Sequence, residues 1–75
     1  MSKINDIEQR EIYISLFEKF QNLLTQTQKQ AFQLYFLENL SYQEIADITA
    51  TTRAAAYDSV KKAIQKLEKY QEKIN

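Results

Sequence analysis

The 75 residues suffice for one domain with a modest core, because a chain this short buries only about 60% of the surface of its unfolded form. Hydrophobic residues make up 44% of the chain and charged residues 27%, values typical of a globular fold. The chain has no cysteine, histidine or glycine, so disulfides, the common nucleophile pairs, zinc sites and phosphate-binding glycine loops cannot be built. The sequence therefore predicts a protein that is not an enzyme and holds no cofactor or metal.

The absence of both glycine and proline also bears on the fold. Hairpins favour Asn-Gly or Asp-Gly turns, so this composition favours helices joined by short polar connections. No apolar run approaches the roughly 20 residues of a membrane span, and the first residues lack the apolar stretch of a signal peptide. We expect an all-α protein of four helices, a single domain over residues 1–75, in the cytoplasm.

Charge is distributed unevenly although ten basic and ten acidic residues cancel. Residues 1–50 contain four Lys or Arg against seven Asp or Glu, a net charge of −3. Residues 51–75 contain six against three, a net charge of +3. The C-terminal third is therefore the candidate surface for a polyanion.

Two helices are predicted in the first half of the chain. Asn5 is placed to cap the first, with Glu8 in the third position of a capping box. Its apolar face consists of Tyr13, Leu16, Phe17, Phe20, Leu23 and Leu24. Thr25 and Gln28 form the matching box of a second helix that continues through Leu37. This second helix is apolar almost all round, so we expect it to lie centrally.

The clearest helix start lies at Ser41, which forms an S-x-x-E capping box with Glu44. Leu40 and Ile45 are spaced for the hydrophobic staple that often accompanies such a box. The short helix that follows ends before a run of β-branched residues. Thr52 or Thr51 can then cap a long C-terminal helix over about 53–74.

A two-turn helix, a short turn and a longer helix are typical of the helix-turn-helix, here over about 41–62. The small Ala46 permits a close crossing of the two helices, and Ala56 and Val60 face inward. In this motif the second helix enters the major groove of DNA. Its groove-facing residues would be Arg53, Ala54, Tyr57, Asp58, Lys61 and Lys62. Arg53 suits guanine or a phosphate, and the two lysines suit phosphates.

Several short stretches resemble the YlxM family of small bacterial helix-turn-helix proteins. They are Leu16-Phe17-Glu18, Leu23-Leu24-Thr25, Leu34-Tyr35, Ser41, Glu44-Ile45-Ala46, Arg53, Ala55 and Tyr57-Asp58. The resemblance implies helices like those of the promoter-reading C-terminal domain of sigma factors. Because the family is usually encoded beside the GTPase of the signal recognition particle, it also implies an accessory or regulatory role toward components of that particle.

The chain departs from that family's pattern around the turn. Ala50 stands where glycine is usual, so it must adopt a positive φ or reshape the turn. Thr49 replaces an apolar residue, whose contact Ile48 is expected to take over. Ala54 replaces a glutamine, which removes a base-reading amide. Longer relatives continue with more C-terminal helix, and a partner surface carried there would be missing.

Charge leaves the ligand of the motif open. From Ser41 to Lys62 the sequence contains three basic and three acidic residues, so the motif has no net charge. The isoelectric point of the chain is near 6.2, whereas that of DNA-binding domains is commonly above about 9. Double-stranded DNA is one predicted partner. The alternatives are a protein-interaction module of the signal recognition particle pathway and the binding of structured RNA through the lysine-rich end of the long helix.

The long helix also carries a heptad seam of inward-facing residues, Ala56, Val60, Ala63, Leu67, Tyr70 and Ile74. A three-helix core should cover the first half of this seam. The second half, Leu67, Tyr70 and Ile74, is predicted to overhang it and to need a partner. Either the first helix bends back over this part of the seam, which is the commoner arrangement in a domain this small, or a second copy of the chain covers it as a homodimer interface.

Overall fold

The computed structural model describes residues 7–74, with side chains described for residues 7–72. Within that range the chain forms four α-helices and no strand, which confirms the all-α prediction. The helices are α1 (Ile7–Phe20), α2 (Gln26–Phe32), α3 (Tyr42–Thr49) and α4 (Arg53–Ile74). A 3₁₀ turn, η1 (Gln21–Leu23), follows α1, and a π-helical segment, η2 (Gln33–Leu37), extends α2. The predicted cap at Asn5 lies outside the described residues.

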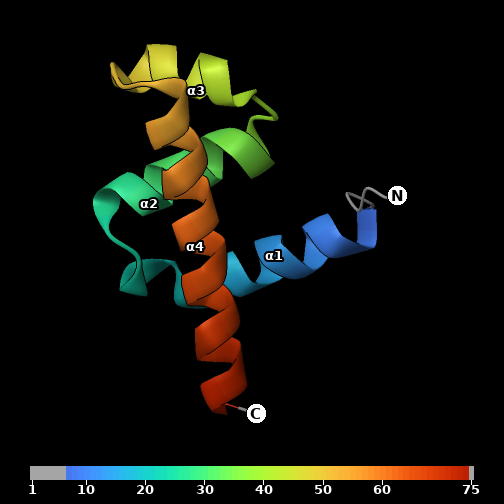
Figure 1. The fold of residues 1–75 in the computed structure, drawn as a ribbon. Coiled ribbons are helices and arrows are strands. Elements are labelled where there is room, and N and C mark those ends of the chain that lie inside the picture. Colours follow the sequence, from blue (N-terminus) through green and yellow to red (C-terminus); the bar gives the residue numbers. More distant parts are fainter. Residues whose placement is uncertain (1–6, 75) are drawn as a thin grey trace.

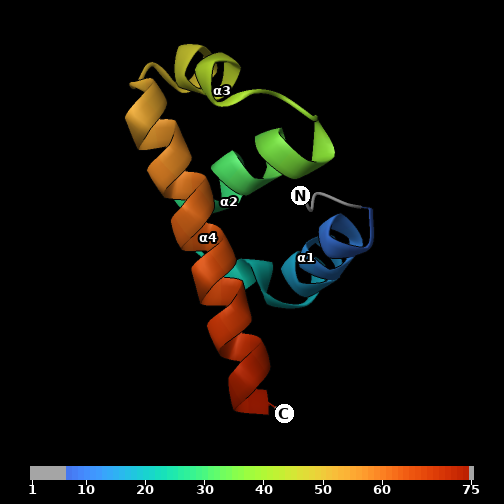
Figure 2. The same cartoon turned by 45° about the vertical axis from the view of Figure 1, so that its right-hand side comes forward.

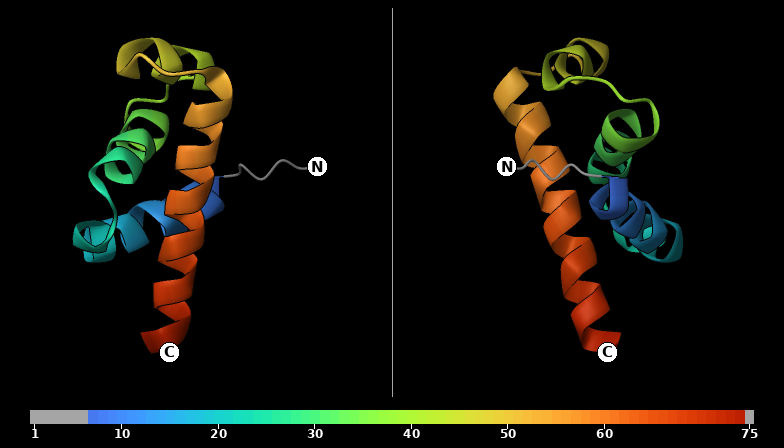
Figure 3. Two further views of the ribbon diagram at one scale, coloured as in Figure 1. Left: turned by 60° about the vertical axis from the view of Figure 1, so that its left-hand side comes forward. Right: turned by 90° about the vertical axis from the view of Figure 1, so that its right-hand side faces the viewer.

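The long helix α4 is the element on which the others pack (Figure 1). It contacts α1, α2 and α3, and its C-terminal end runs past them (Figure 2). Seen from the side, α1 and α2 lie together on one side of α4, while α3 closes the end where α4 begins (Figure 3). In the described residues no helix is long and apolar enough to cross a membrane.

The core is apolar throughout, and no polar side chain is buried among residues 7–72. Phe32 of α2 is fully buried and stacks on Phe17 of α1 and on Phe36 of η2, each at 4.4 Å between ring centroids. The predicted central position of the second helix is therefore confirmed. The inward residues of α4 are Ala56, Val60, Ala63 and Leu67.

Two of the predicted capping boxes are present. Thr25 Oγ1 accepts a hydrogen bond from the Gln28 N–H at 3.1 Å, and Gln28 Oε1 accepts one from the Thr25 N–H at 3.1 Å. Ser41 Oγ and Glu44 Oε1 make the equivalent pair of bonds at 3.1 and 2.8 Å. These boxes set where α2 and α3 begin, because each satisfies backbone N–H groups that the helix itself cannot pair.

The structure differs from the sequence prediction at the ends of the first two helices. α1 gives way to η1 at Gln21, and this tighter turn leaves Leu23, predicted on the core face, 51% exposed, while Leu24 is buried. The predicted second helix is interrupted after Phe32 by η2, in which the Glu38 N–H donates to Gln33 O, five residues back. Such wide turns insert one extra residue into the helical ladder.

The side chain of Arg10 ties α1 to the end of η2. Its Nη2 donates to the Phe36 carbonyl at 2.6 Å, and its guanidinium lies 5.3 Å from the centroid of the Phe36 ring. The bond satisfies a carbonyl near the end of the helical segment.

The connections on both sides of α3 contain a residue in the left-handed region, Asn39 with φ 60° and Ala50 with φ 57°. Asparagine tolerates this conformation, whereas the Cβ of alanine crowds its own carbonyl. The predicted positive φ at Ala50 is thus confirmed, and the turn keeps its shape at a cost in energy.

Replacing Ala50 with glycine should therefore stabilise the protein. We expect Ala50→Gly to raise the free energy of unfolding by about 1 kcal/mol, because glycine adopts this conformation without the penalty. Ala55→Gly, in the right-handed first turn of α4, is the matched control and should lower it by about 0.5–1 kcal/mol. Urea unfolding measures both, and equal losses in the two variants would contradict the strain at Ala50.

Candidate nucleic-acid interface

The turn between α3 and α4 is held by hydrogen bonds from three consecutive residues. The N–H groups of Ala50 and Thr51 both donate to the carbonyl of Ala46, the latter at 2.9 Å. Thr49 Oγ1 donates to the Ile45 carbonyl at 2.8 Å and lies 2.9 Å from Thr51 Oγ1. These bonds pair the carbonyls at the end of α3, so the crossing of the two helices is fixed without glycine.

The apolar contact expected at the end of α3 is not made by Ile48. Its side chain is 57% exposed, and Thr49 is half-buried instead. The prediction was wrong because the hydroxyl of Thr49 bonds within its own helix and turn, which lets the residue keep its inward position.

Thr52, one of the two threonines proposed as a cap, caps α4. Its Oγ1 accepts from the Ala55 N–H at 3.0 Å, while Thr51 bonds to Thr49. Behind this cap Ala46, Ala56 and Val60 are buried as predicted, so α3 packs closely on the first turns of α4. The hydrogen-bonded turn and this close packing together produce the geometry of a helix-turn-helix.

All six residues predicted to face a groove are exposed on α4: Arg53, Ala54, Tyr57, Asp58, Lys61 and Lys62. Their spacing along the helix places them on successive turns of one strip, here called the recognition strip. Lys61 Nζ lies 5.8 Å from the centroid of the Tyr57 ring. Lys62 Nζ lies 3.3 Å from Asp58 Oδ2, so part of the positive charge of the strip is neutralised from within it.

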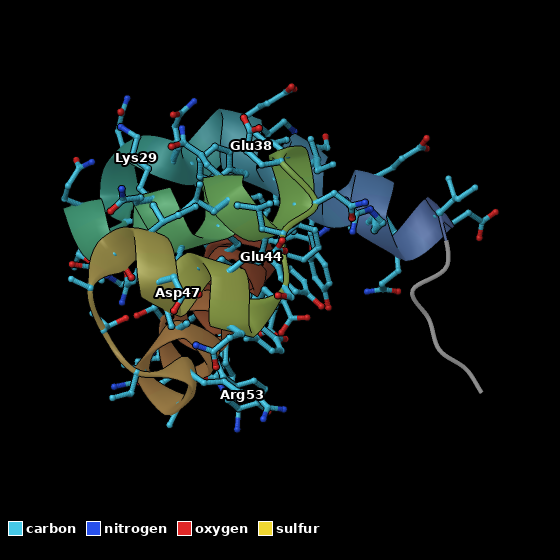
Figure 4. The ribbon with its side chains drawn as sticks, turned by 90° about the horizontal axis from the view of Figure 1, so that it is seen from above. Lys29, Glu38, Glu44, Asp47 and Arg53 are labelled. Atoms are coloured by element: carbon cyan, nitrogen blue, oxygen red, sulfur yellow. The ribbon has the colours of Figure 1, made fainter. Side chains whose placement is uncertain are left out.

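Acidic side chains of α3 lie beside the recognition strip of α4. Seen along α4, Glu44 and Asp47 lie across the top of α3, between Arg53 on one side and Lys29 and Glu38 on the other (Figure 4). Glu44 is engaged in its capping box, and Asp47 accepts from Gln43 Nε2 at 3.1 Å. Within residues 7–72 the structure pairs Arg53 with no carboxylate, so its guanidinium is available to a ligand.

A ladder of three tyrosines that the sequence pattern does not predict supports the strip. Tyr42, the first residue of α3, stacks on Tyr35 of η2 with centroids 4.9 Å apart and planes 3° apart. Its ring also meets Tyr57 of α4 edge to face at 5.2 Å. Because these residues lie far apart in the sequence, helical periodicity alone could not have found the contact.

Burial within this ladder raises the pKa of Tyr42 above the ordinary value of 10.0, and the hydrogen bond and nearby charge of Tyr35 act in the same direction. Burial also raises the pKa of Tyr13, whose hydroxyl donates to Glu68 Oε2 at 2.8 Å and so links α1 to α4. Both tyrosines are therefore held in the neutral form by the fold.

The stripe proposed as a homodimer interface is largely used within the chain. Leu67 is fully buried, so the prediction that it overhangs the core was wrong. Tyr70 is half-buried, with its ring 6.0 Å from that of Phe20 at the end of α1. The end of the first helix thus covers the seam at Tyr70, as the alternative stated. The side chain of Ile74 lies outside the described residues, and its part in self-association stays a prediction.

The lysine-rich end of α4 borders an open cavity of about 280 Å³ lined by Gln28, Lys62, Gln65, Lys66 and Lys69. Lys66 Nζ donates to Gln28 Oε1 at 3.2 Å, which ties this end of α4 to the start of α2. This cavity begins at the end of the recognition strip, because Lys62 belongs to both. In the described residues no group of three or more carboxylates is placed to hold a metal ion.

Residues 7–75 match the UPF0122 family, described as "Putative helix-turn-helix protein, YlxM / p13 like". The chain belongs to this family. The resemblance noted in the sequence is thereby confirmed, and the helix-turn-helix seen in the structure is the feature that names the family. UPF0122 is described by this motif and not by a reaction.

Similar UPF0122 proteins occur in Bacillus. Those of Bacillus cereus strain AH187 and of Bacillus thuringiensis subsp. konkukian are each 44% identical to this chain over 59 residues, which is 79% of the chain and 54% of the relative. The chain thus spans about half the length of these relatives. No solved structure matches it.

The raised pKa of Tyr42 predicts a loss of stability at alkaline pH. Above pH 10.0 the unfolded chain loses this proton while the folded chain retains it, so the free energy of unfolding should fall there and stay level below about pH 9. Tyr42→Phe has no proton to lose, so its unfolding free energy should fall less steeply. Denaturant unfolding from pH 7 to 11 measures this, and parallel curves would contradict it.

The burial of Leu67 predicts that its truncation destabilises the fold. Leu67→Ala should lower the free energy of unfolding by about 3 kcal/mol, as for other fully buried leucines. Gln65→Ala, on the exposed side of the same turn, is the control and should change it by less than about 0.5 kcal/mol. A tolerated Leu67→Ala that only alters sedimentation would restore the interface hypothesis.

Proposed function

We propose that this chain is a helix-turn-helix regulatory protein that binds double-stranded DNA through the recognition strip, with no cofactor. The observation that carries the proposal is the exposure of all six strip residues on α4, the helix that follows the capped helix α3 and its tight turn. In this motif the first turns of the second helix enter the major groove, while the preceding helix crosses the backbone. The family description supports the same class of function.

Each side chain then has a role set by its chemistry. Arg53, at the start of α4, takes the paired acceptors of guanine or a phosphate, because its planar fork matches both. Lys61 and Lys62 contact phosphates, which position the protein without reading sequence. Asp58 opposes binding, since it repels phosphate and occupies Lys62 at 3.3 Å.

The balance of charge supports a second candidate, a protein-interaction module. Glu44, Asp47 and Asp58 offset the three basic residues of the motif, so little affinity can come from counterion release. On the exposed face of α3, Ile48 offers an apolar contact beside Asp47. By resemblance to YlxM proteins the partner would belong to the cytoplasmic signal recognition particle pathway.

A gel-shift or anisotropy titration separates these candidates. Fluorescent duplex DNA of random sequence and a structured RNA hairpin are titrated with the protein at two salt concentrations. Duplex binding that weakens with salt and is lost in the triple Arg53→Ala, Lys61→Ala and Lys62→Ala variant supports the first candidate. Binding to neither probe favours the second, and binding to the hairpin that needs Lys66 and Lys69 assigns the lysine-rich end to RNA.

The ion pair within the strip yields a sharper prediction. Asp58→Asn should strengthen duplex binding severalfold on every sequence, because it removes a repulsive charge and frees Lys62. Glu72→Gln makes the same change of charge on exposed helix, about 21 Å further along α4, and should have little effect. Equal effects of the two substitutions would mean that net charge and not this surface governs binding.

A further inference from the structure

The recognition strip presents exposed apolar groups as well as charged ones. In the first turn of α4, Ala54 and Ala55 are exposed and carry only methyl groups. One turn further, Tyr57 is 47% exposed. Ala54 and Tyr57 are three residues apart and so are neighbours on the helix surface. Between Arg53 and Lys61, the part of the strip nearest the turn therefore offers a methyl group next to an aromatic ring.

The tyrosine ladder holds that ring in place. Tyr42 of α3 meets Tyr57 edge to face and is itself stacked on Tyr35 of η2, so the ring that contacts Tyr57 is held in turn by a second element. Lys61 lies over the same ring, at 5.8 Å from its centroid. A ring already ordered in the free protein loses little conformational freedom when a ligand contacts it, which favours a direct reading role.

The small first turn lets the helix approach closely. Ala54 and Ala55 leave the backbone at the start of α4 unshielded by long side chains, so this turn can lie near the base edges. There the C5 methyl of thymine is the apolar feature, and alanine and aromatic side chains contact it. Cytosine has a hydrogen at that position and offers no such contact.

We propose that Ala54 and Tyr57 read the C5 methyl group of thymine in the major groove, with Tyr42 as the positioning residue for Tyr57. The inference rests on the proposed function, since it names what the recognition strip recognises in DNA. It assigns a specificity role to Ala54, at a position where a base-reading amide is absent.

The test removes only the methyl group. A duplex enriched by the protein from a random library is compared with copies in which each thymine is replaced in turn by deoxyuridine. We expect one or two positions at which the replacement raises Kd about fourfold, which corresponds to roughly 0.8 kcal/mol for one buried methyl-sized group. At the same position 5-methylcytosine should bind more tightly than cytosine.

Variants of Tyr57 connect the effect to the ring. Tyr57→Phe keeps the apolar ring and should keep the difference between thymine and deoxyuridine. Tyr57→Asn removes the ring and should reduce that difference to less than about twofold, a change that loss of a phosphate contact would not produce. Circular dichroism checks the fold of each variant, and the comparison of duplexes with the parent protein needs no variant.

The outcomes separate this inference from the proposed function. Enrichment of a sequence that binds equally well with deoxyuridine at every position overturns methyl reading and leaves DNA binding intact. A methyl effect that persists undiminished in folded Tyr57→Asn overturns the assignment to Tyr57. Failure of the library to yield any bound duplex overturns the proposed function, and this inference with it.

Discussion

Phe32 occupies the centre of the packing, and the positions of the other elements follow from it. Its ring lies between those of Phe17 and Phe36, so one residue joins α1, α2 and η2. The inward side of α4 completes the same apolar cluster with small residues such as Ala56 and Ala63. Close packing of rings against methyl groups leaves few alternative arrangements. Because this contact is not directional, the residues at which α2, α3 and α4 begin are set by their caps.

Those directional features were the most readable part of the sequence. Each of α2, α3 and α4 begins directly after a cap, Thr25, Ser41 or Thr52, whose side-chain oxygen accepts a hydrogen bond from the backbone N–H three residues on. Such bonds are local, so spacing alone predicts them. The same holds for the exposure of the recognition strip, which follows from helical periodicity once the start at Arg53 is known.

The sequence could not predict features that depend on contacts between distant residues or on small changes of helical pitch. The exposure of Leu23 follows from a 3₁₀ turn, and the interruption after Phe32 from an added residue in the helix. Neither changes the apolar pattern. The burial of Leu67 depends on how α1 and α2 pack on α4, and the ladder of Tyr35, Tyr42 and Tyr57 joins three elements. Both depend on tertiary packing, which periodicity does not encode.

The two left-handed residues that bound α3 have a consequence for its motion. Of the two, Ala50 gives up conformational strain if the segment between them opens, which offsets part of the cost of releasing Ile45 and Ala46 from the core. The strain at Ala50 thus lowers the free energy needed to open α3, so its amide protons should exchange with solvent through openings smaller than global unfolding. A ligand that spans α3 and α4 would suppress such openings. Binding would then slow the amide hydrogen exchange of Tyr42–Thr49 even if the mean structure did not change.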